Sequence, residues 1–139
     1  MQQHQHSLSI ATHGQKLYDI SREVAAAVSA SRIASGLVTV FCRHTSCSLI
    51  INENADPDVR HDLEAFMRRL VPEGDPAYIH TLEGPDDMPA HIKTALTAST
   101  LSIPVAEGRM LLGTWQGIYL FEHRSAPHRR EVVVHVMGQ

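Results

Sequence analysis

Three polar segments of the sequence carry the residues that could do chemistry. The segment richest in metal-ligand types is 80–91, His-Thr-Leu-Glu-Gly-Pro-Asp-Asp-Met-Pro-Ala-His, which holds two histidines and three carboxylates. Neutral imidazole is a common ligand for zinc and related metals. Asp87 lies four residues before His91, so on a helix its carboxylate could orient that ring. The spacing matches no strict His-x3-His pattern, and solvated loop residues are the alternative interpretation.

The second segment brackets an apolar stretch with polar residues. Arg43-His-Thr-Ser-Cys-Ser precedes it and Asn52-Glu-Asn-Ala-Asp-Pro follows it. Side chains at strand ends can converge on a pocket while the strands hold them rigid. The alternative is turn chemistry, with His44 in a structural role and Asp56 serving only as a helix cap.

The third segment is Glu107-Gly-Arg-Met-Leu-Leu-Gly-Thr-Trp-Gln-Gly. Its three glycines predict tight turns or close backbone approach. Trp115, the single tryptophan, stands beside Gln116 and near Arg109, and this set could stack on and orient a planar or anionic group. Ordinary packing of the tryptophan is the alternative.

Composition excludes several function classes. The 139 residues fit one domain spanning 1–139, with 43% apolar and 19% charged residues. The net charge is −3 and the longest basic run is Arg129-Arg130, which argues against a nucleic-acid binder. No apolar stretch is long enough to span a membrane, and the N-terminal residues show no signal core, so we expect a cytoplasmic protein. Cys42 and Cys47 are then expected to be reduced packing residues.

The elements that must position these residues are mostly strands. Alternating or β-branched apolar stretches predict strands at 7–12, 37–42, 47–51, 100–105 (cut by Pro104), 110–112, 117–123 and 131–137. Asp19 is predicted to cap a helix whose apolar stripe is Leu17, Ile20, Val24, Ala27 and Val28. Asp56 and Pro57 predict the start of a second helix reaching Leu70, and a short third helix is expected from Pro89. Strands in adjacent pairs predict an antiparallel α+β domain.

Four ordered motifs together resemble the YjbQ-like family, UPF0047. They are His44-Thr-Ser-Cys-Ser-Leu, Asn52-Glu-Asn-Ala-Asp-Pro, Gly84-Pro-Asp-Asp-Met-Pro-Ala-His-Ile and Gly108-Arg-Met-Leu-Leu-Gly-Thr-Trp-Gln-Gly-Ile. The resemblance runs from about Ser7 to the final strand. It implies a single-domain β-sandwich of mostly antiparallel strands with two to three helices, assembled as a homotrimer.

The resemblance also implies a site. His44, His80 and His91 match the family's metal-binding or catalytic set, with zinc or magnesium as the expected divalent ion. The remaining matched residues divide into a catalytic group, Glu53, Asp56 and Arg109, and a substrate-binding group, Thr45, Ser46, Asn52, Trp115 and Gln116. Asp86, Asp87 and His123 lie where family members vary and are left without a role.

Three functions follow as hypotheses. The resemblance implies a secondary thiamine-phosphate synthase, a transferase in which Arg109 and a metal stabilise the leaving pyrophosphate and Trp115 stacks on the pyrimidine. The first alternative is a metal-dependent hydrolase that uses the three histidines, with Glu53 as general base. The second is a trimer that binds a metal or metabolite without turnover. All three expect a small-molecule ligand and self-association, and none expects nucleic acid or membrane.

Overall fold

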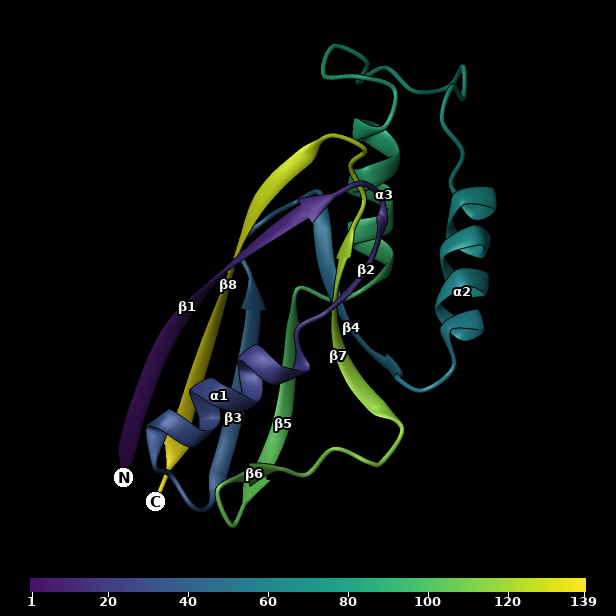
Figure 1. Ribbon diagram of the computed structural model, residues 1–139. Helices are drawn as coiled ribbons and strands as arrows, with labels where there is room; N and C mark the ends of the chain where they lie inside the picture. The colour runs from purple at the N-terminus through teal and green to yellow at the C-terminus, as the bar shows by residue number, and fades with distance from the viewer.

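Two antiparallel sheets make up most of the chain (Figure 1). The computed structural model describes residues 1–139. The larger sheet has the order β1, β8, β3, β5, β6, with bounds Gln2–His13, Pro127–Gly138, Gly36–Cys42, Thr100–Ala106 and Arg109–Met110. The smaller sheet has the order β2, β7, β4, with bounds Lys16–Asp19, Gln116–Glu122 and Cys47–Glu53. The helices are α1 (Ser21–Ser31), α2 (Pro57–Leu70) and α3 (Asp87–Leu96).

The main apolar core is shared by the two sheets and α1. Successive side chains of a strand point to opposite faces, so β7 contributes to two different clusters. Ile118 and Leu120 join the main core with the valines of β3 and β8. Tyr119 and Phe121 face the other way and pack with Met67 of α2. Because β7 is buried on both faces, its sequence from Ile118 to Phe121 is continuously apolar.

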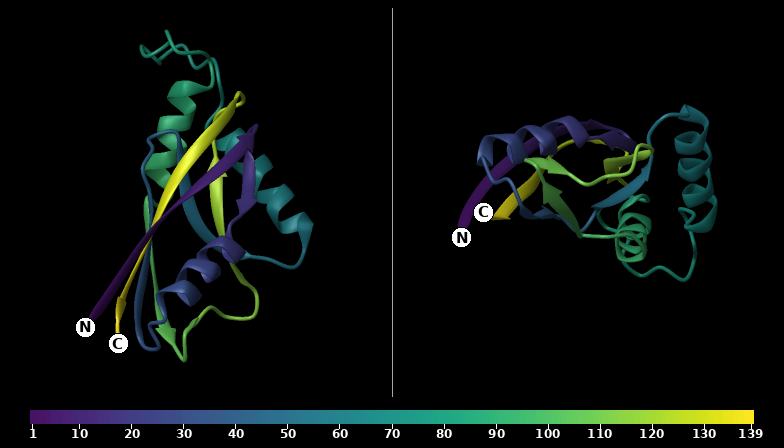
Figure 2. Two further views of the ribbon diagram at one scale, coloured as in Figure 1. Left: turned by 60° about the vertical axis from the view of Figure 1, so that its left-hand side comes forward. Right: turned by 90° about the horizontal axis from the view of Figure 1, so that it is seen from below.

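The helices differ in how they meet the sheets. α1 buries Val24, Ala27 and Val28 in the main core. α2 lies at the outer edge of the molecule, beyond the small sheet (Figure 2), and Met67 is its single buried residue. Two of its large apolar side chains are about half exposed, Phe66 at 50% and Leu70 at 53%. None of the three helices is long and apolar enough to cross a membrane.

The predicted α+β class and antiparallel pairing are confirmed. The helix start at Asp19 was wrong, because Lys16–Asp19 forms strand β2 against β7 and the helix begins at Ser21. Asp19 still accepts a hydrogen bond from the Ser21 amide, at 2.9 Å. Pro104 does not cut its strand, since β5 continues through it and its carbonyl accepts from the Leu111 amide.

Smaller differences concern element ends. The first strand extends to Gln2, the third helix starts two residues earlier than Pro89, and the strand expected at 110–112 is Arg109–Met110. The predicted cap of α2 is confirmed, because the Asp56 carboxylate accepts from the Asp58 amide at 2.9 Å and Pro57 follows it. Cys42 and Cys47 are both buried and free, with their sulfur atoms 3.4 Å apart.

Polar groups buried in the sandwich are mostly paired. The Glu122 carboxylate accepts from the Arg130 guanidinium at 2.6 and 2.7 Å, and from the Thr12 hydroxyl at 2.6 Å. The His123 ring is 1% exposed, with Nε2 2.9 Å from the Ser48 hydroxyl and Nδ1 without a partner. Burial, with a smaller contribution from the charge of Lys93, lowers the pKa of His123 to about 3. The imidazole is therefore neutral in the folded protein.

Candidate metal centre

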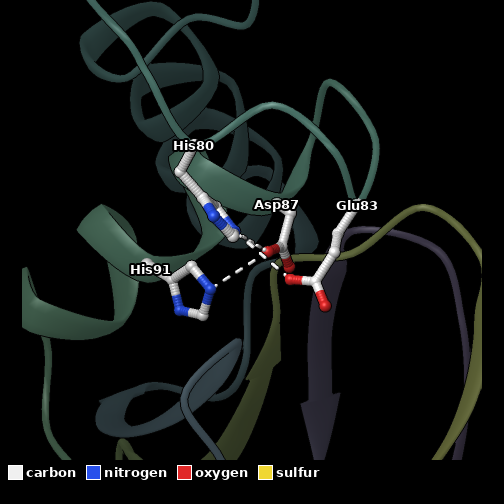
Figure 3. Close-up of side chains that lie close together, drawn as sticks. All are labelled: His80, Glu83, Asp87 and His91. Carbon is white, nitrogen blue, oxygen red and sulfur yellow. Dashed lines mark hydrogen bonds and ion pairs between the residues drawn. The ribbon is translucent and has the colours of Figure 1, made fainter.

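The long connection between α2 and α3 and the first turns of α3 bring four ligand-type side chains together. They are His80, Glu83, Asp87 and His91, and one ligand atom of each lies within 4.8 Å of the others (Figure 3). Asp87 and His91 are four residues apart on α3, so they share one face of the helix. The loop then folds back to place His80 and Glu83 over that face. Four donors from one short segment therefore meet at a single point.

Asp87 is the centre of this cluster. Its Oδ2 lies 2.7 Å from His80 Nε2 and 3.1 Å from His91 Nε2, while Glu83 Oε2 lies 3.2 Å from the same nitrogen of His80. The side chain of Asp87 is only 4% exposed, whereas those of His80 and Glu83 are 41% and 66% exposed. The cluster thus has a buried floor and an open side.

The second ring nitrogen of His91 fixes its tautomer. His91 Nδ1 lies 2.9 Å from the carbonyl oxygen of Thr45, and a carbonyl can only accept, so Nδ1 carries the proton. In the neutral ring Nε2 then presents a lone pair to the Asp87 carboxylate, which also has only lone pairs to offer. This contact is favourable when a cation lies between the two groups, either a proton or a metal ion.

Arg124 holds the carboxylates from behind. Its guanidinium donates to Asp87 Oδ1 at 2.6 Å, to Asp86 Oδ2 at 3.0 Å and to the carbonyl of Glu83 at 2.9 Å. The amide of Ser125 also donates to Asp86, at 2.8 Å. These contacts leave Oδ2 of Asp87 directed at the two imidazoles.

The charges of the cluster shift the pKa values of His80 and Asp87 in opposite directions. The hydrogen bond that His80 donates to Asp87, partly opposed by desolvation, raises the pKa of His80. Burial alone would raise the pKa of Asp87, but the hydrogen bond that it accepts from His80 and the charge of Arg124 lower it below its ordinary value. Asp87 is therefore ionised at neutral pH, as a metal ligand must be.

The donor set suits a divalent transition metal. Zinc is bound by imidazole nitrogen and carboxylate oxygen at about 2.0–2.2 Å, so ligand atoms of one site lie within roughly 4 Å of each other. The contacts of 2.7 to 3.2 Å within the cluster are shorter than the roughly 3.4 Å that separates ligand atoms in a tetrahedral zinc site, so the side chains would separate slightly to admit the ion. The carbonyl behind His91 and the guanidinium behind Asp87 are the outer contacts that orient such ligands.

A cavity opens beside the cluster. It has a volume of about 390 Å³ and is lined by His80 together with Tyr78, Gly84 and Met88. The volume falls in the range of small-molecule sites. Of the four ligand-type residues, His80 alone lines this cavity, so a ligand there would contact His80.

His44 lies outside this cluster. Its Nε2 accepts a hydrogen bond from the Glu131 amide at 2.8 Å, and burial, followed by the charge of Arg130, lowers its pKa. The neighbouring Thr45 contributes through its carbonyl, which holds His91. The Ser46 hydroxyl accepts from Arg130 at 2.9 Å. Of the three predicted metal ligands, the structure brings His80 and His91 together.

The remaining predicted site residues lie on elements away from the start of α3, most of them around the end of β4 and the start of β7 (Figure 1). The Glu53 carboxylate accepts from the amides of Ala55 and Asp56, while Asp56 caps α2. The Gln116 side chain accepts from the Gly113 amide at 2.8 Å, and Trp115 is 62% exposed. Asn52 pairs with Gly117 across β4 and β7, and Arg109 lines a separate 690 Å³ cavity beside α1. Within one chain, this second group does not meet the histidine cluster.

Sequence analysis identified the 80–91 segment, with its two histidines and three carboxylates, as a possible ligand set. It gave Glu83 no individual role and Asp87 only the orienting of His91. Arg124 was not considered at all, because nothing near it in the sequence indicates that the turn between β7 and β8 meets the start of α3. Its one available signal was a lone arginine directly after a buried strand.

Comparisons with known proteins agree with this fold. A family model described as UPF0047 protein YjbQ-like matches residues 6–139. The UPF0047 protein sll1880 of Synechocystis sp. is 56% identical over 137 residues, covering 99% of this chain and 93% of its own. YjbQ of Escherichia coli O157:H7 is 46% identical over 78% of each chain. The crystal structure of the conserved hypothetical protein TT1486 from Thermus thermophilus superposes with a TM-score of 0.86 at 37% identity, covering 95% of this chain and 99% of its own. The chain therefore belongs to the UPF0047 YjbQ-like family.

Proposed function

We propose that this protein is a divalent-metal-dependent transferase that forms thiamine phosphate. The observation that supports a metal ion is the convergence of His80, Glu83, Asp87 and His91, whose ligand atoms lie within 4.8 Å of one another. The Thr45 carbonyl holds Nδ1 of His91, so that Nε2 faces the Asp87 carboxylate. The family resemblance suggests the reaction. Two imidazoles favour zinc or a similar metal over magnesium, which prefers oxygen ligands.

The reaction joins a pyrimidine methyl pyrophosphate to a thiazole phosphate. The carbon–oxygen bond to pyrophosphate breaks, and the thiazole nitrogen supplies the electron pair for the new carbon–nitrogen bond. His80, Glu83, Asp87 and His91 would hold the ion, which would neutralise charge on the leaving pyrophosphate. The cavity beside His80 gives the substrate its space, with the ring of Tyr78 on its wall.

We further propose the homotrimer that the resemblance implies. The loop carrying the cluster exposes two large apolar side chains, Ile79 and Leu82, each 97% accessible. Exposed apolar groups of this size beside a site are typical of a surface that another chain covers. A second subunit could also bring the Glu53 and Trp115 end of its sandwich to the histidine cluster, which one chain does not do by itself.

A metal-dependent hydrolase is the second candidate. Glu83 favours it, because this carboxylate is two-thirds exposed while its Oε2 touches His80. A carboxylate in that position could accept a proton from an attacking water. Glu53, the base expected from sequence, accepts two backbone hydrogen bonds at the other end of the molecule.

The test is product formation by the purified full-length chain. Pyrimidine methyl pyrophosphate and thiazole phosphate are supplied, thiamine phosphate is measured, and the protein is compared as purified, after chelation, and after zinc or manganese is restored. We expect product that disappears with chelator and in His91→Ala, but persists in His61→Ala. His61 is the matched control because it is an exposed histidine that also contacts an aspartate, Asp62, at 3.2 Å.

Other outcomes overturn the proposal in identifiable ways. Metal-dependent release of phosphate from a phosphate ester, without thiamine phosphate, would favour the hydrolase. Metal uptake with no product from either assay would favour a binding protein without turnover. Product formation that is unaffected by chelation and by His91→Ala would remove the histidine cluster from the reaction.

A further inference from the structure

Lys93 is a buried cation that no carboxylate contacts directly. The residue is 4% exposed, and its ammonium group donates to one protein atom, Oε1 of Gln15 at 3.2 Å. An ammonium group has three protons to donate, so two are left unused by side chains. Lys93 forms no ion pair with any carboxylate. Buried charges are normally paired, because taking an isolated charge out of water is costly.

The other buried cation of the chain shows the usual arrangement. Arg130 has a side chain that is 5% exposed, and its guanidinium donates twice to Glu122, which is fully buried. Lys93 has a comparable degree of burial but lacks such a carboxylate. Glu73 in the same cavity and Asp86 attract the Lys93 charge, but neither lies within ion-pair distance of the ammonium, so two of its protons remain available to a small anion.

The surroundings of Lys93 form a small polar cavity. Its volume is about 340 Å³, and its lining includes Lys93, Gln15, Arg68, Glu73 and Ser125. With two cations and one carboxylate, the lining carries a formal charge of +1. The Ser125 hydroxyl and the Gln15 amide, 2.9 Å apart, add neutral hydrogen-bonding groups.

We propose that this cavity is an anion subsite that takes a phosphoryl group, either free phosphate or the phosphate of a phosphomonoester. The ammonium of Lys93 and the guanidinium of Arg68 would supply charge-assisted hydrogen bonds, and Ser125 a neutral one. The lining has a single apolar residue among its seven, Val71, which excludes a lipid or aromatic ligand as the natural occupant.

The subsite is separate from the histidine cluster but connected to it. The two lie on different faces of α3, and Ser125 links them, because its amide donates to Asp86 while its hydroxyl faces Gln15. Arg124 then joins Asp86 to Asp87. Anion binding at Lys93 requires no metal, so this inference stands or falls independently of the proposed transferase.

The test is calorimetric titration of the full-length chain with inorganic phosphate and, separately, with methyl phosphate. EDTA is present throughout, so that no metal at the histidine cluster can bind the ligand. We expect saturable binding of one anion per chain. Loss of a charge-assisted hydrogen bond predicts at least about tenfold weaker binding in Lys93→Met, where methionine keeps the side-chain volume. Arg68→Gln is expected to weaken binding by about three- to tenfold.

The chain offers a matched control, since Lys16 is its one other lysine. Lys16 is exposed on β2, with its ammonium 5.1 Å from the Tyr18 ring, and Lys16→Met should change phosphate affinity by less than about twofold. If Lys93→Met does not fold, side-chain nitrogen NMR of the wild-type protein replaces it. The Lys93 signal should then move on addition of phosphate, and that of Lys16 should not.

Each outcome decides between the alternatives. Similar affinity for both ligands supports a phosphomonoester subsite, and binding of inorganic phosphate alone supports a free-phosphate subsite. No binding of either ligand overturns the proposal. Equal affinity in wild type and Lys93→Met, or an unmoved Lys93 signal, overturns it as well.

Discussion

At the scale of single residues, His91 has the most informative surroundings. One ring nitrogen is fixed by the Thr45 carbonyl, and the other is left facing Asp87 and His80. His80 and His91 could be predicted as partners because twelve residues of chain limit how far apart they can lie. His44, Glu53 and Arg109 could not be placed in the same way, because their positions depend on how distant strands pack.

Arg124 is predicted to be a positioning residue of the metal site. Arg124→Gln removes the donors that hold Asp86 and Asp87, so zinc affinity should fall by about 10–100-fold, as is typical for lost outer contacts of a metal ligand. The measurement is zinc titration against a chromophoric chelator. Arg129→Gln is the control, since Arg129 contacts only Ser9 at the surface. Equal zinc affinity in Arg124→Gln and wild type would contradict this role.

His123 is predicted to make the fold sensitive to acid. Its pKa is about 3 in the folded chain against 6.5 for an ordinary histidine, so the unfolded state binds the proton first. Its contribution to stability is therefore complete above about pH 6.5 and is lost as the pH falls toward 3, with a limiting slope of about 1.4 kcal/mol per pH unit.

Urea unfolding between pH 7 and pH 4 measures this effect. His123→Gln removes the titrating group and should flatten the pH dependence of the free energy of unfolding by about that slope, although carboxylates still contribute. His61→Gln, at a histidine whose side chain is 75% exposed, should keep the wild-type dependence. The same steepness in His123→Gln and wild type would show that His123 does not titrate between the two states.

At the scale of secondary structure, local sequence patterns predicted most helices and strands. The errors occur where pairing with a distant strand decides the structure of a segment. Asp56 and Pro57 define the start of α2 by their own chemistry, and the structure shows the expected cap. Lys16–Asp19 resembled the first turn of a helix because Leu17 continues the stripe of α1. It is a strand because it pairs with β7 in register, Leu17 opposite Phe121, and no local pattern contains that information.

The antiparallel pairing of β3 with β8 predicts a strict requirement for glycine at position 36. A Cβ added to Gly36 would lie 2.0 Å from the Met137 carbonyl oxygen, so the paired strands would have to separate. Gly36→Ala should lower the free energy of unfolding by about 1–3 kcal/mol or more, as overpacking does. Gly113→Ala meets only the Gln116 side chain at 3.4 Å and should change stability by less than about 0.5 kcal/mol. Comparable denaturation midpoints for the two variants would refute the requirement.

At the scale of the whole molecule, the class of fold follows from sequence but the arrangement of its two ends does not. Strand-rich patterning predicted the antiparallel α+β domain, and the β-sandwich itself came from the family resemblance. The separation of the histidine cluster from the Glu53 and Trp115 end follows from the strand order of the two sheets, which periodicity does not specify. Large apolar side chains are exposed at both ends, with Leu82 97% accessible in the loop before α3 and Trp115 62% accessible before β7.

The proposed homotrimer would be held by the exposed apolar residues of the loop before α3, Ile79 and Leu82. Replacing Leu82 by glutamate should shift the mass measured by light scattering from three chains toward one, because a charge would have to be buried. Arg22→Glu, on the exposed side of α1, is the control and should remain trimeric. A wild-type chain that is monomeric at all concentrations, or a trimeric Leu82→Glu, would exclude this assembly surface.

The central claim is that His80, Glu83, Asp87 and His91 bind one divalent metal ion. Its most direct test is elemental analysis combined with competitive zinc titration of the wild-type chain and its histidine variants. We predict one zinc per chain in the wild type, retained in His61→Ala and in His44→Ala, and lost in His80→Ala and His91→Ala. Undiminished zinc content and affinity in both His80→Ala and His91→Ala would contradict the claim.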